Sequence, residues 1–399
     1  MRVDDMVLIS VDDHVVEPRG LFDGRVSAKY ADQAPRVVTR ADGADVWLYD
    51  GKEITLSGLN AVAGKTPEEY SWEPTSYGAV RPGCYDADAR IADMNRNGVL
   101  ASMCFPSFAR FCGEVFCEAS DKEAAAAMVQ AYNDWHIDEW CAGHPGRFIP
   151  LAVLPFWNPQ LAAAEVARIA AKGCHAVTFS EDPTGLGLPN IHDPFWDPFY
   201  AACVDNDVLV CLHIGTANRF NLPEGAPIDV GLSLTGLTAV QSFANILWSP
   251  LLTRFPSMRF VLSEGGIGWL PSTLERVDDV YRRHRFWTKQ DLGGKLPSER
   301  AREVFTYCFI EDRAGIRDRE IIGVDNITWE CDYPHSASTW PLAAESVGEQ
   351  LAGLTDEEID KVTWRNAVER FSFDPFAYRS RHQCTVGALR ATALQTDAA

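Results

Sequence analysis

Short apolar runs alternate with helical segments along most of the chain, and this alternation constrains the fold more than any other feature. The first run, residues 6–11, contains no turn residue, which is typical of a strand buried on both faces of a parallel sheet. Eight strands that alternate with helices predict an α/β chain wound as a right-handed (β/α)₈ TIM barrel. A doubly wound open sheet is the alternative, but no run is followed by the glycine fingerprint of a dinucleotide site. The eight runs cover residues 6–11, 99–106, 147–154, 174–179, 208–213, 259–264, 304–310 and 326–331, and the last two are weaker.

Helical patterns fill the intervals between these runs. Gly98 and Gly173 follow two of the helical segments, as expected where a helix ends in a left-handed residue. The predicted helices cover residues 88–97, 120–142, 159–172, 195–206, 234–255 and 356–371, with a further helix that begins near Pro271.

Two regions depart from this pattern. Residues 27–85 show no sustained periodicity, and we interpret them as an insertion after the first strand that forms a lid over one end of the barrel. Within it, residues 45–52 predict a hairpin with its turn at Asp50-Gly51. Residues 1–378 are therefore expected to form a single barrel domain, and residues 379–399, which are small and polar, a flexible C-terminal tail.

Composition excludes several classes of partner. The net charge of −20 argues against binding to nucleic acid or to anionic membrane surfaces. The apolar stretches look shorter than the ~20 residues that a membrane-spanning helix needs, and the N-terminus lacks the apolar core of a signal peptide. The 11 cysteines include no C-x-x-C pair and are interpreted as reduced thiols. These features predict a cytoplasmic enzyme with a small-molecule substrate.

Polar residues stand where several of the predicted strands end. Asp12 and His14 follow the first run and, two residues apart, point to the same side of an extended chain, while Asp13 points to the other. His213, Glu264 and Asp332 end the fifth, sixth and eighth runs. Singly, a D-x-H motif more often begins a turn and a lone histidine is more often structural. Together they would meet at the C-terminal rim of a barrel, where imidazole and carboxylate donors suit Zn²⁺ or Mn²⁺.

Four motifs carry a resemblance to a known family. They are D-x-H with V-x-E-P from Asp12 to Pro18, H-x-G-T from His213 to Thr216, E-G-G-I-G-W-L-P from Glu264 to Pro271, and W-E-C-D-Y-P-H from Trp329 to His335. Together they resemble the amidohydrolase superfamily, and within it the branch that contains aminocarboxymuconate-semialdehyde decarboxylase and related aromatic-acid decarboxylases. The resemblance implies a (β/α)₈ barrel with one divalent metal, Zn²⁺ first and Mn²⁺ as the alternative. The implied metal ligands are Asp12, His14, His213 and Asp332.

Glu264 departs from the family pattern, because the decarboxylases of this branch tend to carry a histidine there. A glutamate whose pKa is raised by burial and by Asp332 would suit a hydrolase, in which it orients a metal-bound water or moves a proton. The alternative is that Glu264 pairs with a basic residue of the lid. The candidate catalytic residues are Asp332, Glu264 and His335, of which His335 is expected to lie over the metal unless its turn exposes it.

Four further residues are candidates for substrate binding. Arg81 and Arg110 would clamp a substrate carboxylate, and Glu181 lies just beyond the fourth strand on the same rim. Trp340 would belong to an aromatic wall. The plainer interpretations are solvated surface arginines and aromatic core packing.

Three functions remain open from the sequence. The first is a metal-dependent hydrolase that acts on a small carboxylated or aromatic substrate through a metal-activated water. The alternative is a non-oxidative, metal-dependent decarboxylase (carboxy-lyase) of an aromatic or dienoic acid. The third is a barrel that only binds a ligand.

A homodimer is also expected. Relatives in the branch that this sequence resembles commonly dimerise across the barrel rim. In addition, residues 281–287 form a basic aromatic stretch that is unusual on an acidic chain. The alternative is a solvated helix end whose cations complement the helix dipole.

Overall fold

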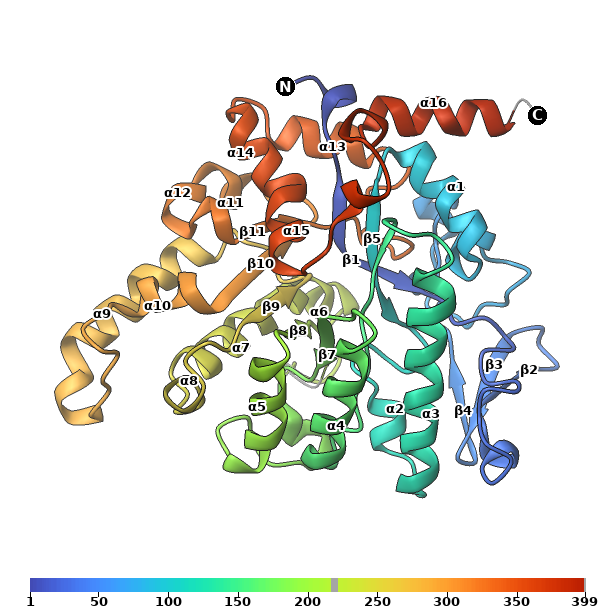
Figure 1. Cartoon of the computed structure of the whole chain (residues 1–399), viewed down its shortest axis with the longest axis horizontal. Coiled ribbons are helices and arrows are strands. Elements are labelled where there is room, and N and C mark those ends of the chain that lie inside the picture. The colour runs from blue at the N-terminus through green and yellow to red at the C-terminus, as the bar shows by residue number, and fades with distance from the viewer. Residues whose placement is uncertain (217–221, 398–399) are drawn as a thin grey trace.

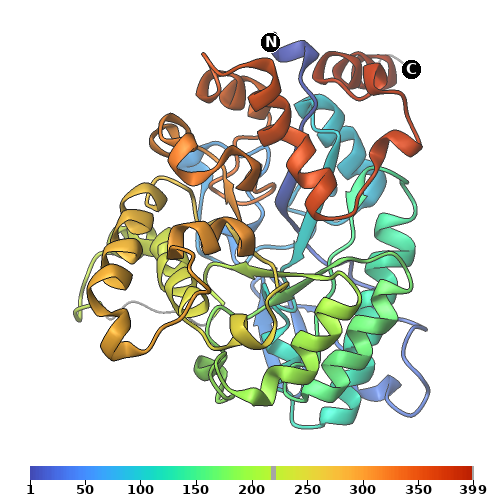
Figure 2. The same cartoon turned by 60° about the vertical axis from the view of Figure 1, so that its left-hand side comes forward.

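The computed structural model describes residues 1–216 and 222–397 and contains eight parallel strands in the predicted order. They form a three-stranded sheet, β1-β5-β6, and a five-stranded sheet, β11-β10-β9-β8-β7. Helices surround the strands in both views of Figures 1 and 2. All eight predicted runs contain a strand. The strands are β1 (Ile9–Val15), β5 (Ala101–Pro106), β6 (Phe148–Ile149), β7 (Ala176–Phe179), β8 (Leu209–His213), β9 (Phe260–Ser263), β10 (Phe305–Phe309) and β11 (Ile327–Trp329).

Backbone hydrogen bonds join the two sheets at both edges. Beyond β6, the Ala152 N–H donates to Ala176 O at 3.1 Å, and the Thr178 N–H donates to Ala152 O at 2.9 Å. At the other edge, the Asp332 N–H donates to Asp12 O at 2.9 Å. Backbone contacts therefore run in sequence order from β1 to β11 and back to β1. Side chains between these strands, such as Val11, Met103, Cys211 and Val261, are fully buried, which explains why the runs are apolar throughout.

The helices largely follow the prediction. Asp86 caps α1 (Ala87–Asn97) by accepting from the Ala89 N–H, and Gly98 ends it at φ 78°. The predicted helix 120–142 is α3 (Lys122–Trp135) with a π-helical extension over 136–141, and the predicted helix 234–255 is divided by Pro250 into two. The others include α2 (Glu114–Cys117), α3 (Lys122–Trp135), α4 (Pro159–Ala170), α5 (Asp197–Asp205), α6 (Ile228–Leu234), α7 (Thr238–Leu247), α8 (Leu251–Arg254), α9 (Leu270–Thr288), α10 (Pro297–Val304), α11 (Arg313–Arg317), α12 (Arg319–Ile322), α13 (Ala343–Gln350), α14 (Asp356–Asp360) and α15 (Asn366–Arg370).

The insertion after β1 is more regular than predicted. The hairpin with its turn at Asp50-Gly51 is present as β3 (Asp45–Tyr49) and β4 (Lys52–Thr55), and β2 (Arg36–Thr39), which the sequence analysis missed, pairs with β3. The small sheet packs beside the main body, where Trp47 stacks on Phe108 with ring centroids 4.5 Å apart. A later part of the insertion reaches the loop after β11, because the Val62 N–H donates to Pro334 O at 2.9 Å.

The C-terminal segment differs from the predicted flexible tail. Residues Val386–Asp397 form α16, which lies beside α1 at the end of the molecule that holds both termini (Figures 1 and 2). The Val386 N–H donates to Met6 O at 2.9 Å, and Arg390 makes two hydrogen bonds with the Glu345 carboxylate at 2.6 and 2.8 Å. Composition alone missed this helix because its order comes from contacts with distant segments.

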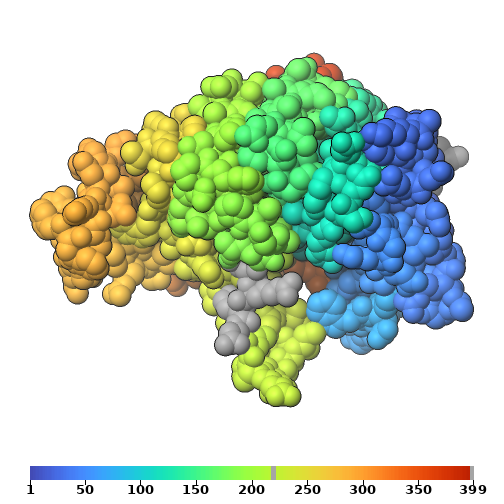
Figure 3. All heavy atoms as spheres, turned by 90° about the horizontal axis from the view of Figure 1, so that it is seen from below, coloured from blue at the N-terminus to red at the C-terminus, as the bar shows by residue number. Residues whose placement is uncertain are grey.

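One helical stretch is longer and more apolar than the sequence analysis expected. Residues Ile228–Leu247 span 20 residues with a mean hydropathy of 1.3, enough by length and composition to cross a membrane. A core helix of a soluble protein passes the same test, and Phe243 of α7 is fully buried against Phe305. The α6 part is exposed, and Figure 3 shows this yellow-green region protruding from the body. The expected cytoplasmic location and absence of membrane contact stay predictions.

Candidate metal centre

The strand ends bring four predicted ligands together. Asp12 and His14 lie on β1, His213 ends β8, and Asp332 follows β11. We call these four residues the ligand cluster. All four are fully buried. The structure thus gathers side chains that are up to 320 residues apart in sequence, as convergence at the carboxyl ends of parallel strands predicts.

Distances within the ligand cluster are those of groups that share an ion. His14 Nε2 lies 3.2 Å from Asp332 Oδ1, 3.5 Å from Asp12 Oδ1 and 3.2 Å from His213 Nε2. His213 Nε2 lies 3.6 Å from Asp12 Oδ2. Two ligand atoms each about 2.1 Å from one ion are separated by roughly 3.0–3.4 Å in octahedral or tetrahedral geometry. Asp12, His14 and His213 form one group with the spacing of metal ligands, and Asp332 adjoins it through His14, so the cluster could hold a divalent cation.

Unsatisfied oxygens point to the same conclusion. Both carboxylate oxygens of Asp12 and both of Asp332 are buried and accept no hydrogen bond from the residues that the structure describes. Buried polar atoms normally have partners, because an unpaired one costs free energy. A divalent cation would satisfy at least one oxygen of each residue, and its positive charge would offset the two buried carboxylates.

The tautomer of His213 suits a metal ligand. Its Nδ1–H donates to the carbonyl oxygen of Ile214 at 2.7 Å, which leaves the lone pair of Nε2 facing Asp12 and His14. Burial lowers the pKa of His213 to about 3. The pKa of His14 is also lowered, mainly by burial and then by the charges of His335 and His213. Both imidazoles are therefore neutral, which is the form that binds metals.

Glu264 and His335 border the ligand cluster. Glu264 Oε2 lies 3.2 Å from His213 Nε2, and His335 Nδ1 lies 3.2 Å from Asp332 Oδ1. The His335 ring stacks on that of His14, with centroids 3.5 Å apart. The predicted position of His335 over the metal ligands is thus observed, and Glu264 contacts a histidine of the cluster instead of a basic residue of the insertion. His14, Glu264, Asp332 and His335 also form a second group with ligand-like spacing.

The backbone at this rim is unusual. Glu264 and Asp332 have φ of 57° and 58°, a left-handed conformation that residues with a Cβ rarely adopt. Such strain tends to occur at functional sites, where the surrounding structure holds it. It turns both carboxylates toward the histidines just after their strands end.

Crowded carboxyls dominate the electrostatics. Burial, followed by the charges of Glu330, Glu264 and Asp332, raises the pKa of Asp12 well above its usual range. Burial and then Asp332 raise the pKa of Glu264 to about 8. Without a cation, burial favours the protonated forms of both groups. The same set of groups would ionise readily around a divalent metal.

Asp13 lies on the opposite side of β1, as the alternation predicts. It accepts hydrogen bonds from Ser10 at 3.0 Å, from Ser102, and from the Tyr333 N–H at 3.0 Å. Arg90 Nη2 donates to the carbonyl oxygen of His14 at 2.6 Å. These contacts fix β1 against the loop that carries Asp332, so they orient the ligand cluster without entering it.

Sequence reasoning missed two residues near the cluster. The ring of Phe111 lies against His213 and His14, with centroids 4.2 and 5.0 Å away, and so covers the cluster. Glu330 is fully buried, and its charge acts on Asp12. Alternation would have found Glu330, because it stands two residues before Asp332. No local signal marks Phe111, which lies in the loop after β5.

The four predicted substrate residues are not all free to bind a substrate. Arg81 makes two hydrogen bonds with the Asp93 carboxylate, at 2.6 and 2.7 Å, and its guanidinium lies 4.8 Å from the ring centroid of Trp340. Arg110 is exposed and pairs with Glu118 at 3.1 Å. The structure therefore does not place Arg81 as a clamp for a substrate carboxylate or Trp340 in an aromatic wall of the site.

Arg110 and Glu181 have more suitable positions. Arg110 lines a cavity of about 380 Å³ together with Phe111, Asn60 and Gly215, so this cavity adjoins the ligand cluster through the Phe111 ring. Glu181 is buried, and its charge raises the pKa of Glu264. Its Oε1 accepts from Ser242 at 3.2 Å, while its Oε2 has no hydrogen-bond partner among the described residues.

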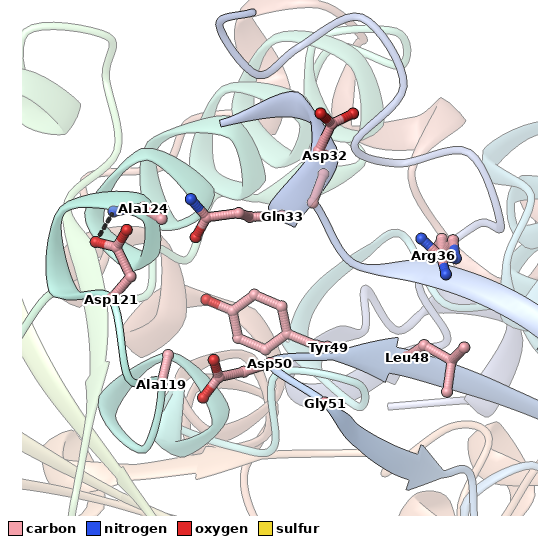
Figure 4. A pocket seen from close by; sticks show the side chains of 11 residues that line it. Asp32, Gln33, Arg36, Leu48, Tyr49, Asp50, Gly51, Ala119, Asp121 and Ala124 are labelled. Carbon is pink, nitrogen blue, oxygen red and sulfur yellow. Dashed lines mark hydrogen bonds between the residues drawn. The ribbon is translucent and has the colours of Figure 1, made fainter. Parts of the chain in front are cut away.

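A second cavity, of about 400 Å³, lies between the small sheet and α3 (Figure 4). Two of its acidic residues already bind the backbone, because Asp50 accepts from the Ser120 N–H at 2.8 Å and Asp121 caps α3. Asp50 and Asp121 therefore have structural roles, and among the described residues the side chains of this cavity form no group with the spacing of metal ligands.

Comparisons with known proteins agree with this geometry. The family model of the amidohydrolases matches residues 40–373. The chain is 24% identical over 301 residues to the decarboxylase orsB of Emericella nidulans, covering 71% of this chain and 84% of that protein. It is 28% identical over 281 residues to the gamma-resorcylate decarboxylase of Rhodococcus jostii, covering 64% and 79%. It is 22% identical over 361 residues to the 2-amino-3-carboxymuconate-6-semialdehyde decarboxylase of Caenorhabditis elegans, covering 74% and 83%.

Solved structures share the fold. An amidohydrolase from Mycobacterium avium subsp. paratuberculosis superposes with a TM-score of 0.69 at 20% identity, covering 92% of this chain and 97% of that one. A dihydroxybenzoic acid decarboxylase from Polaromonas, solved with manganese and the inhibitor 2-nitroresorcinol, superposes with a TM-score of 0.62 at 19% identity, covering 94% and 98%. The resemblance seen in the sequence is thereby confirmed, and the chain belongs to the amidohydrolase family.

Proposed function

We propose that this enzyme is a divalent-metal-dependent decarboxylase of a small hydroxylated aromatic acid. The observation that carries the proposal is the similarity to decarboxylases over most of the chain, including a gamma-resorcylate decarboxylase and a structural neighbour that acts on dihydroxybenzoic acid. The hydrolase that the sequence analysis placed first is the less favoured candidate. Glu264 had argued for it, but Glu264 lies beside His213 within the site and does not by itself require a hydrolytic water.

The proposed scaffold is a closed (β/α)₈ barrel with residues 27–85 as a lid. The hydrogen bonds at both sheet edges support the closure, and the contacts of residues 59 and 62 with the loop after β11 support the lid. In such a barrel, the ligand cluster lies at the C-terminal rim, where active sites of this fold occur.

Asp12, His14, His213 and Asp332 would hold the metal. Two carboxylates and two imidazoles are acceptable to either Zn²⁺ or Mn²⁺. The oxygen donors and the manganese in a structural neighbour favour Mn²⁺ over the Zn²⁺ that the sequence analysis placed first. When bound, the ion supplies positive charge that attracts the carboxylate and phenolic oxygens of a substrate.

The remaining chemistry is a proton delivered to carbon. When the bond between the ring carbon and the carboxylate breaks, CO₂ leaves, and the electron pair on the ring carbon takes up one proton. We assign the proton to the Asp332 carboxyl, whose Oδ1 faces His14 and His335, while its Oδ2 is free of partners among the described residues. His335 would return a proton to Asp332 after turnover, by passing on its Nδ1 proton while Nε2 takes one up from water. Phe111, over the histidines, would keep water from the site.

A labelled assay separates the two functions. The metal-loaded protein is incubated with hydroxylated benzoic acids in a sealed vessel in D₂O, and CO₂ and the product are analysed. Decarboxylation predicts CO₂ release with one deuterium on the ring carbon that lost it. Incorporation of ¹⁸O from labelled water into product, without CO₂, would instead establish a hydrolase.

Variants of the proton path sharpen the test. Asp332→Asn removes the proton donor but also a proposed ligand, so its metal content must be measured. His335→Gln lies outside the proposed ligand set and should retain the metal while slowing turnover by about 10²-fold or more, the usual contribution of a general acid–base group. An unchanged rate in His335→Gln would contradict the relay.

We also propose that the chain forms a homodimer through the end of α9. Phe286 and Trp287 are 79% and 72% exposed, and this end of α9 projects from the body in Figure 1. Aromatic and arginine side chains are enriched in interface cores. Arg283 lies 2.9 Å from Asp279 of its own helix, so the aromatic rings are the stronger part of this argument.

A further inference from the structure

A cavity of about 540 Å³ lies between α1, α16 and the segment that joins α15 to α16. It lies at the opposite end of the strands from the ligand cluster, because Arg147 in its wall directly precedes β6. Its lining includes Arg147, Arg379 and His382 but no aspartate or glutamate. On a chain with a net charge of −20, a cavity with two arginines, a histidine and no acid is unusual.

Arg147 forms the floor of this cavity and is only 2% exposed. Its Nε donates to Leu100 O at 2.5 Å, and its Nη2 donates to Asn95 Oδ1 at 2.8 Å and to Val99 O at 3.3 Å. All three acceptors are neutral. Among residues 1–216 and 222–397, no carboxylate forms an ion pair with Arg147, so its charge is buried without a counterion.

Arg379 increases this imbalance. It is partly buried and, within the described part of the chain, makes no ion pair of its own. Burial, followed by the charge of Arg379, lowers the pKa of Arg147 to about 9. A buried charge without a partner is costly, and two neighbouring cations repel each other, so an anion in this cavity would relieve both costs.

A purely structural role accounts for only part of the arrangement. The bonds of Arg147 to backbone carbonyls hold the start of β6 against the segment before β5, which explains its Nε and Nη2. They do not explain why Arg379 and His382 line the same cavity. The adjacent Arg381 shows the usual pattern, since its guanidinium pairs with Asp360 at 2.7 Å.

We propose that this cavity binds a small anion with phosphate or carboxylate oxygens, held by Arg379 and His382 above the buried guanidinium of Arg147. Planar guanidinium groups form paired, charge-assisted hydrogen bonds with such oxygens. The site is separate from the metal centre and does not depend on the proposed reaction.

The proposal is tested by calorimetric titration of the metal-loaded protein with inorganic phosphate, at constant ionic strength set with chloride. The double variant Arg379→Ala, His382→Ala should bind phosphate about tenfold more weakly or worse, the loss expected for charge-assisted hydrogen bonds. Arg381→Ala is the matched control, because it removes a neighbouring charge outside the cavity, and its affinity should stay within about twofold. Circular dichroism and metal content verify that each variant is folded and loaded.

Three results would overturn the proposal. They are no phosphate binding by the unmodified protein up to ~10 mM, equal binding by the double variant, and an equal loss in Arg381→Ala. Phosphate bound only to the active-site metal would give the second result, since the double variant leaves the ligand cluster intact. Competition by malonate, a dicarboxylate, decides which of the two anion chemistries the cavity prefers.

Discussion

Replacing Glu264 with glutamine should stabilise the metal-free protein at high pH. The pKa of Glu264 rises from its ordinary 4.5 to about 8, because burial and Asp332 disfavour its charged form. The folded state therefore binds this proton more tightly than the unfolded state, so folding loses stability as the pH rises from 4.5 through 8. Glutamine does not titrate, so the Glu264→Gln variant does not lose this stability as the pH rises.

The magnitude follows from the shift. About 3.5 pKa units at ~1.4 kcal/mol each give an upper bound of about 5 kcal/mol at pH 8. The Glu264 side chain is 19% exposed, so solvent screening reduces this, and about 2–4 kcal/mol is expected. The stability difference between variant and unmodified protein should be near its minimum below about pH 4.5 and grow with pH.

Urea unfolding at several pH values between 5 and 8, followed by tryptophan fluorescence after treatment with a chelator, measures this difference. Other groups that titrate in both proteins largely cancel in it. Glu320→Gln is the control, because Glu320 is exposed on α12 and should show no such growth. A difference that stays flat, or that falls as the pH rises, would refute the reasoning.

The bound metal should reverse the effect. A divalent cation favours the charged form of every carboxylate around it, so the penalty for ionising Glu264 disappears. In the metal-loaded protein at pH 8, Glu264→Gln should therefore be no more stable than the unmodified protein. A persistent stabilisation would mean that the cation binds elsewhere.

Three further predictions follow from the site and the surface. His14→Ala and His213→Ala should each retain less than about a tenth of the metal by elemental analysis, because each removes a ligand, while circular dichroism stays unchanged. Phe111→Ala should release the metal to a chelator about tenfold faster, because the ring that covers the histidines is gone. Arg283→Glu with Arg285→Glu should weaken the dimer in sedimentation experiments, because repulsion is added beside the exposed aromatic rings.

The first two of these have a control elsewhere in the chain. His192→Ala should keep its metal, since His192 hydrogen-bonds to Ser249 and lies outside the ligand cluster. Phe286→Ala should release metal at the normal rate. A full equivalent of metal in both histidine variants would contradict the ligand assignment. A single monomeric species of the unmodified protein at micromolar concentration would contradict the dimer.

The strands and the convergence of the candidate ligands could be predicted because short-range rules determine them. A fully apolar run is buried on both faces, and alternation along β1 separates Asp12 and His14 from Asp13. The same rule would have identified Glu330 beside Asp332. The order of α16 could not be predicted in this way, because it depends on contacts with Met6 and Glu345, which lie far away in sequence.

The substrate contacts were harder to predict because long-range pairing decides which cations are free. Arg81 was expected to clamp a substrate carboxylate, but its guanidinium already forms two hydrogen bonds with Asp93. Asp93 in turn accepts a hydrogen bond from the Tyr333 hydroxyl at 2.7 Å. Tyr333 directly follows Asp332. Arg81 can therefore act on the metal centre only through Asp93 and Tyr333, by holding the loop that presents Asp332. For the proposed acid substrate, the positive charge would then come from the proposed metal or from Arg110, so we expect the metal, more than any arginine, to set the affinity for acids.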